Sequence, residues 1–260
     1  MRGRCKMIGQ VCWILAALLL APWSHALAEE VVDLELVLLA DATGSIDTAE
    51  IKFQREGYAS AITDPQVLDA ITGGLHGKIA VTYVEWGDSN SQQVVVPWTV
   101  ISDAGGAKKI AGVLRSTPRL AFGSNAIGSA LFKGLQLLET NQYKGLRRVI
   151  DLSADSANNW NGPPITQVRD LITAKGITIN GLAILCRDLE CGGRPVLYNL
   201  EEAFQRDIIG GPGAFVVTAG DMKSFAAAVK RKLILEIAGT AVQQFAKVPE
   251  KTVLTPGEGP

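Results

Sequence analysis

Three oxygen-bearing side chains follow the first strongly apolar segment of the chain. Asp41, Thr43 and Ser45 stand at alternate positions directly after the apolar run 34–39. Alternate residues of an extended segment point the same way, so one carboxylate and two hydroxyls can converge on one point. Hard oxygen donors of this kind suit Mg²⁺, and also Mn²⁺ or Ca²⁺. The spacing therefore predicts a divalent metal site in this loop.

The stretch 41–45 resembles the Asp-x-Ser-x-Ser signature of the metal-ion-dependent adhesion site (MIDAS) of von Willebrand factor A (vWA) domains, with Thr43 in place of the first serine. In that family a second loop supplies a Thr and a third supplies an Asp. The third loop matches residues 147–155, which end an apolar strand in a small-residue turn and an acid. The resemblance implies that Asp155 is the third-loop carboxylate.

The second loop departs from the family pattern at one position. Residues 122–131 resemble its Gly-Thr-Ala-Ile-Gly-x-Ala-Leu form, but Asn125 stands where that form has Thr, and Ser124 is the adjacent hydroxyl. The resemblance implies a ligand set for one divalent ion, made up of Asp41, Thr43, Ser45, Ser124, Asn125 and Asp155. Because a hydroxyl ligand is replaced, a metal-free version of the site is the alternative.

Acidic residues in strand-to-helix turns have other common roles. Taken singly, Asp41 and Asp155 fit helix caps or acceptors of backbone N–H groups in the loop. Their occurrence together, in the order of the family, favours the metal site. Asp47, followed three residues later by Glu50, predicts a capping box at the start of a helix.

Asp151 lies inside a predicted strand, short of the acidic loop. A buried carboxylate needs a charged or hydrogen-bonding partner. We expect it to pair with Arg147, Arg148 or a backbone donor, and not to bind the metal directly.

The residues after Asp155 predict a contact surface. Asn158, Asn159 and Trp160 follow the acidic loop onto the same face, and an exposed aromatic side chain there is a natural anchor for a protein partner. The alternative is that Trp160 packs over the Pro-Pro turn at 163–164.

Catalysis is the main competing class of function. Ser89 is the best candidate nucleophile, and it follows the carboxyl end of the predicted strand 79–85. The only histidine after residue 28 is His76, which lies before the amino end of that strand, away from Ser89. The sequence has no Gly-x-Ser-x-Gly elbow, no phosphate-binding Gly-x-x-x-x-Gly-Lys loop and no Gly-x-Gly-x-x-Gly fingerprint. We predict that the protein is not an enzyme, with a hydrolase as the alternative.

The elements that position these residues alternate between short apolar runs and segments of helical period. This pattern predicts a doubly wound α/β fold with helices on both faces of a mostly parallel sheet. The run 94–98 follows a short polar turn and contains Pro97, which predicts an antiparallel edge strand. The six predicted strands cover residues 34–39, 79–85, 94–98, 148–152, 177–185 and 214–218. The predicted helices cover residues 48–62, 107–114, 127–138, 165–174, 200–208 and 222–237.

The first 28 residues predict a secretory signal peptide. Three basic residues precede an apolar stretch at 11–21, and the small-residue pattern Ala-Leu-Ala ends at Ala28. The apolar stretch is too short for a membrane-spanning helix. Cleavage of the whole signal peptide removes three basic and no acidic residues, so the formal charge moves from −1 to −4. An acidic chain of this kind is not expected to bind nucleic acid. No segment after residue 28 approaches the apolar length of a membrane-spanning helix, so insertion into a membrane is not expected either.

Two cysteines follow the predicted cleavage point. Cys186 and Cys191 have four residues between them in a Gly-rich loop of an exported chain, which favours a local disulfide over a metal pair. Residues 240–260 lack apolar periodicity and predict a flexible tail.

Within the vWA family, residues 147–159 look most like a bacterial branch of exported proteins of unassigned function, the DUF1194 type. The resemblance implies one vWA-like domain over residues 29–239. It also implies a periplasmic or secreted binding module that engages a protein partner, which supplies an Asp or Glu to the metal. The alternative of another class is a metal-free scaffolding protein of the cell envelope.

Overall fold

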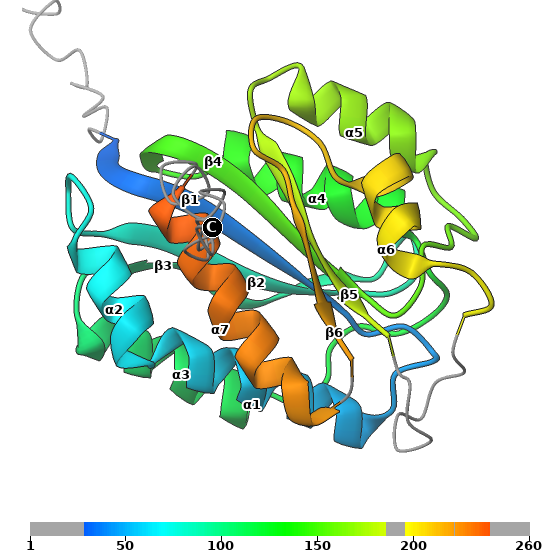
Figure 1. Ribbon diagram of the computed structural model, residues 1–260, viewed down its shortest axis with the longest axis horizontal. Helices are drawn as coiled ribbons and strands as arrows, with labels where there is room; N and C mark the ends of the chain where they lie inside the picture. The colour runs from blue at the N-terminus through cyan, green and yellow to red at the C-terminus, as the bar shows by residue number, and fades with distance from the viewer. Residues whose placement is uncertain (1–28, 186–195, 221, 240–260) are drawn as a thin grey trace, which may run out of the picture.

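A computed structural model describes residues 29–185, 196–220 and 222–239. A six-stranded sheet in the order β3-β2-β1-β4-β5-β6 runs through the molecule (Figure 1). Four neighbouring pairs are parallel, and only β3 is antiparallel to its neighbour β2. The predicted sheet, with one antiparallel edge strand, is confirmed. The strands are β1 Glu30–Asp41, β2 Ile79–Trp86, β3 Gln92–Ile101, β4 Tyr143–Ala154, β5 Thr178–Ile184 and β6 Val216–Ala219.

Helices cover both faces of the sheet (Figure 1). One apolar core joins one face to α1, α2, α3 and α7, and a second core joins the other face to α4, α5, α6 and the π-helix that continues α6. The helices are α1 Thr48–Ile62, α2 Pro65–Thr72, α3 Ala104–Ser116, α4 Ile127–Glu139, α5 Ile165–Thr173, α6 Leu200–Ala203 with its π-helical turn Phe204–Ile208, and α7 Met222–Ala238.

The central strand β1 supplies side chains to both cores. Leu36 and Leu38 point into the first core, whereas Val37 and Leu39 point into the second. Successive side chains of a strand face opposite sides of the sheet, so a strand covered on both faces must be apolar at every position. This burial fixes the strand that carries Asp41 at its end.

The structure adds one helix to the prediction and extends several elements. Helix α2 was missed, although Asp64 accepts a hydrogen bond from the backbone N–H of Gln66 and Pro65 occupies the first turn. An Asp-Pro start is a helix signal, but the helix has only eight residues and its pattern is short. The capping box of Asp47 and Glu50 is confirmed at the start of α1.

Three predictions lie outside the described residues. They are the signal peptide at 1–28, the pairing of Cys186 with Cys191, and the tail at 240–260. No helix in the described ranges has the length and apolarity needed to cross a bilayer.

Candidate functional site

The two acidic loops lie side by side because their strands are parallel neighbours. β1 pairs with β4 in a register that sets Ala40 beside Ser153, so Asp41 and Asp155 lie at the same edge of the sheet. The carboxyl ends of parallel strands are the usual place for a ligand site in an open α/β sheet. The fold therefore brings together two loops that are more than a hundred residues apart in sequence.

Asp41 is a buried carboxylate that is only half satisfied. Its Oδ1 accepts a hydrogen bond of 2.8 Å from the backbone N–H of Thr43, and its Oδ2 has no hydrogen-bond partner among the described residues. Burial, and then the charge of Asp155, raise the pKa of Asp41 to about 8. One oxygen orders the loop, as many Asp residues do, and the other is open to a further interaction.

Hydroxyl groups surround the carboxylates. Thr43 Oγ1 lies 3.2 Å from Ser45 Oγ. Burial raises the pKa of Asp155, while a hydrogen bond from Ser45 lowers it. Among the described residues no group of three or more His, Cys, Asp or Glu side chains is placed to hold a metal. A metal in this loop cluster would thus depend on hydroxyl and amide oxygens beside two carboxylates.

The second loop contributes a buried amide. Asn125 is buried and its Nδ2 donates a 2.7 Å hydrogen bond to Ser156 Oγ, whereas Ser124 is exposed. Because its nitrogen is engaged, the amide oxygen of Asn125 is the atom available for a ligand. The backbone N–H of Gly44 donates to the carbonyl of Gly123 at 2.8 Å, which joins the second loop to the first. The residues present fit a hard divalent cation, with the buried, unpartnered Oδ2 of Asp41 as the observation that supports it.

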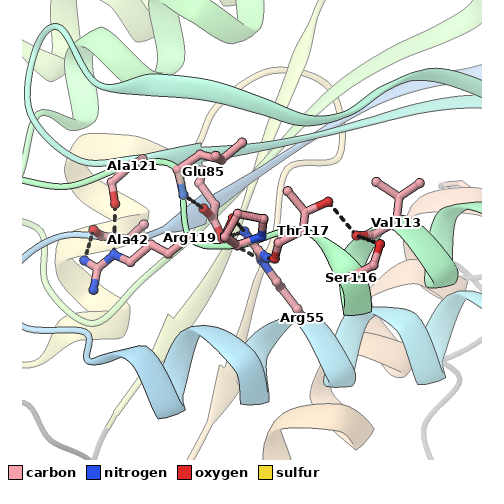
Figure 2. A network of polar contacts seen from close by, with 10 residues as sticks. Ala42, Arg55, Glu85, Val113, Ser116, Thr117, Arg119 and Ala121 are labelled. Carbon is pink, nitrogen blue, oxygen red and sulfur yellow. Dashed lines mark hydrogen bonds and ion pairs between the residues drawn. The ribbon is translucent and has the colours of Figure 1, made fainter.

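Arg119 fastens the first loop to the segment before α4 (Figure 2). Its guanidinium donates to the carbonyl oxygens of Ala121, Ile46 and Thr43 at 2.8–3.0 Å, and also to that of Ala42. Five fixed N–H groups make arginine suited to hold several acceptors at once. The backbone of the predicted metal loop is therefore held from outside by one side chain.

A buried ion pair supports the same segment (Figure 2). Arg55 on α1 pairs with Glu85 on β2 at 2.7 Å, and both side chains are almost fully buried. Arg55 also donates to the carbonyls of Thr117 and Pro118, and Glu85 accepts from the N–H of Leu120 at 3.1 Å. The pair fixes residues 117–120 and, through them, Arg119.

Gly87 allows the second loop to approach the end of β2. A Cβ atom there would lie 2.2 Å from the carbonyl oxygen of Phe122. The N–H of Asp88 donates to that carbonyl at 3.0 Å, and the N–H of Ala126 donates to the carbonyl of Gly87 at 3.1 Å. Only glycine permits this close contact.

The predicted contact residues have different environments. The side chain of Trp160 is 73% exposed, so it is not buried against the Pro-Pro turn. The backbone N–H of Trp160 donates to the carbonyl of Asn125. Asn159 is held internally, since its side chain accepts from the N–H of Gly128 and donates to the carbonyl of Pro163. Asn158 is half-buried. Trp160 is thus the side chain of this group that is free to meet a partner.

The partner of Asp151 differs from the prediction. Asp151 is buried, as expected, but its charge is met by Lys232 Nζ on α7 at 2.6 Å. Arg147 instead donates to the carbonyls of Glu236 and Ile237, and Arg148 donates to the carbonyl of Lys175. The expectation of an Arg147 or Arg148 pair was wrong. Arg147 shares the face of β4 with Asp151 but lies four strand residues away, about 13 Å, and Arg148 faces the opposite side of the sheet.

The candidate catalytic pair is separated by a whole strand. His76 precedes the amino end of β2 and Ser89 follows its carboxyl end, about 26 Å apart for eight residues of strand. Ser89 is engaged with Asp88 and Asn161. The two side chains lie too far apart to act together as nucleophile and base.

A family model matches most of the described chain. Residues 30–241 match the family described as protein of unknown function (DUF1194). The chain belongs to this family. No curated protein matches it.

Solved structures give this DUF1194 chain the fold of a vWA domain. The pilus adhesin SpaC of Lactobacillus rhamnosus GG is 14% identical with a TM-score of 0.55, covering 79% of this chain and 30% of that one. A von Willebrand factor type A protein of Catenulispora acidiphila is 15% identical with a TM-score of 0.52, covering 79% and 43%. The vWF domain of the type V pili tip protein Mfa5 of Porphyromonas gingivalis is 10% identical with a TM-score of 0.51, covering 85% and 98%.

These likenesses establish the fold alone, because the identities are 10 to 15%. The chain spans less than half of the length of the first two of these structures. The predicted vWA-like fold of the DUF1194 type is confirmed. The predicted ligand set stays a prediction.

Some residues that build the site were not found from sequence. Glu85 carried a signal, since a charge inside the apolar strand 79–86 demands a buried partner. Arg119 and Phe122 carried none, because both lie in an irregular segment where exposure is the default. Phe122 is 56% exposed and its ring lies under the guanidinium of Arg119 at 4.6 Å.

Proposed function

We propose that this DUF1194 domain is an exported binding module that engages a protein partner through one divalent metal ion, with Mg²⁺ as the expected ion. The observation that carries the proposal is the buried Oδ2 of Asp41, which has no hydrogen-bond partner among the described residues. A buried, unpaired carboxylate oxygen is costly, and a cation would offset that cost.

The donor set supports a site that is open to a partner. Asp41, Thr43, Ser45 and Asp155 would hold the ion, with the amide oxygen of Asn125 or the exposed hydroxyl of Ser124 completing the set. A bound divalent ion supplies a Lewis-acidic position that a carboxylate oxygen of a partner can occupy. The loop residues keep that position oriented because Arg119 holds the backbone of Ala42 and Thr43.

Exposed aromatic side chains on the adjoining loops support a protein as the partner. Trp160 and Phe122 are more than half exposed, and the loops that carry them hydrogen-bond to each other or to the ends of the neighbouring strands. Aromatic anchors supply much of the affinity of protein interfaces. The likeness to a pilus adhesin and to a pilus tip domain agrees with a binding role outside the cytoplasm.

Calorimetric titration of Mg²⁺ and Mn²⁺ into the purified protein tests the metal site. We expect saturable binding that Asp41→Asn abolishes, since that change removes the central charge. Asp47→Asn is the matched control, because it removes a charge from the same loop while asparagine still caps α1. Absence of metal-dependent heat in the parent protein would refute the metal site.

Asn125 favours one other candidate, a metal-free scaffolding protein with the same fold. Its amide nitrogen is engaged by Ser156, and it offers no hydroxyl. Asn125→Thr separates the two candidates. If metal binds only to that variant, the natural site does not use metal. If the parent binds metal, chelator-sensitive capture of a partner that Trp160→Ala abolishes would support the binding module.

A further inference from the structure

A cavity lies beside α1, and none of the predicted metal ligands lines it. It has a volume of about 640 Å³ and lies between α1, the end of α3 and the segment 117–119. Cavities of roughly 300–1,000 Å³ are typical of small-molecule sites. Its lining includes Arg55 and Thr117, which belong to the polar network drawn in Figure 2.

The wall of this cavity is mainly apolar. Ile51 and Leu114 are buried, Phe53 is half-buried, and the exposed Pro118 also lines the cavity. Phe53 is also held from behind by Phe225, with ring centroids 5.9 Å apart. An apolar wall that packs on the core is rigid enough to receive an alkyl chain or a ring.

The charge of the cavity is positive, in contrast to the chain as a whole. Its charged lining residues are four cations and the single acid Glu56, whereas the formal charge of the chain is −1. Arg115 is neutralised by Glu56 through two hydrogen bonds of 2.7 and 2.8 Å, and Arg55 is neutralised by Glu85. Lys52 and Arg119 are the two cations of the lining that no acidic side chain among the described residues neutralises.

These two cations have different roles. Arg119 donates its N–H groups to carbonyl oxygens, which satisfy its hydrogen bonds but carry no charge to neutralise it. Lys52 is exposed at the rim, and no ion pair within the described ranges includes it. Lys52 is therefore the group that can contact an anion directly.

We propose that this cavity binds a free amphipathic carboxylate, with its hydrocarbon part against Phe53 and Leu114 and its carboxylate at Lys52. The combination of an apolar wall with one unpaired cation at the rim matches one apolar body with one negative head. The site needs no metal, so its test is independent of the proposed function.

Calorimetric titration with decanoate tests the proposal, with octanoate and decyltrimethylammonium as comparisons. We expect saturable one-to-one binding of decanoate. Octanoate should bind about tenfold more weakly, because two CH₂ groups fewer are buried. Decyltrimethylammonium has the same chain with a positive head, so it should bind at least about tenfold more weakly.

Two variants locate the site. Lys52→Glu should weaken decanoate binding about tenfold, and Lys144→Glu, at an exposed position on β4, is the matched control and should leave it unchanged. Ala49→Trp should abolish binding by filling the cavity. If that variant does not fold, the exposed Lys52 position decides.

The proposal is overturned if decanoate shows no saturable binding to the parent. It is equally overturned if Lys52→Glu and Lys144→Glu bind decanoate alike, or if the ammonium compound binds as tightly as decanoate.

Discussion

At the scale of single residues, the site depends on side chains that hold backbone and do not themselves meet a ligand. Arg119 is the clearest case, because its guanidinium binds carbonyls on both sides of the loop that carries Thr43 and Ser45. Asp41 can then keep one oxygen unpaired, since the loop around it is ordered by other groups.

Replacing Arg119 by lysine should therefore destabilise the protein. Arg119→Lys keeps the charge but loses the planar fork, so several buried carbonyls lose their donor, and we expect the free energy of unfolding to fall by about 2–3 kcal/mol. Urea unfolding measures this change. Arg115→Lys is the control, since its exposed pair with Glu56 should contribute under about 1 kcal/mol. Equal effects of the two changes would contradict the role assigned to Arg119.

At the scale of elements, α7 is fastened to β4 at two points. Lys232 pairs with Asp151, and Arg147 binds the carbonyls of Glu236 and Ile237 at the end of the helix. β4 is also the strand that leads into Asp155. The same strand thus supports the acidic loop at its carboxyl end and anchors the last helix along its length.

Because of this contact, replacing Lys232 by an uncharged side chain of similar size should strongly destabilise the protein. Lys232→Met leaves the buried carboxylate of Asp151 without a counter-charge, so the free energy of unfolding should fall by about 3–5 kcal/mol. Lys230→Met, on the same helix, removes only a partly exposed pair with Asp64 and should cost under about 1 kcal/mol. Denaturant unfolding of both variants compares them. Adding Asp151→Asn to Lys232→Met should recover part of the loss, and no recovery would argue against an unpaired charge as the cause.

At the scale of the whole molecule, the buried charges make stability depend on pH. Glu236 faces Asp151, Lys232 and Asn180, and burial first, then the charge of Asp151, raise its pKa from 4.5 to about 7 against the lowering effect of Lys232. The folded protein therefore holds a proton that the unfolded chain has lost between these two pH values. The contribution of Glu236 to the free energy of unfolding should therefore fall as pH rises from about 4.5 to about 7. Asp41, whose pKa is raised to about 8, continues the fall of the total to about pH 8.

The size of this fall is measurable against a variant. A shift of this size corresponds to about 3 kcal/mol over the window. Glu236→Gln removes the titrating group. The difference between the free energies of unfolding at pH 5 and pH 8 should therefore be about 3 kcal/mol smaller in this variant than in the parent. Identical pH dependence in parent and variant would show that Glu236 does not titrate in this window. Glu56 and Asp64, whose pKa values are lowered, act at more acidic pH and cancel in the comparison.

Much of the architecture was predictable because local pattern and burial agree in it. A pattern of a few residues is enough to predict the apolar strand β1, the Pro-containing edge strand β3 and the capping box of α1. The loop with Asp41, Thr43 and Ser45 was found for the same reason, since its spacing is local. Helix α2 was missed because a helix of eight residues provides little periodicity.

The sequence by itself determined which residues are chemically suited to a cation and which segments of the chain form the strands that carry them. Only the tertiary structure decided their environment. It paired Asp151 with Lys232 in place of Arg147, held Asn159 internally while leaving Trp160 exposed, and placed Arg119 against the first loop. The physical reason is that burial and ion pairing depend on segments far apart in the chain, such as β4 and α7, whose contact no local pattern records.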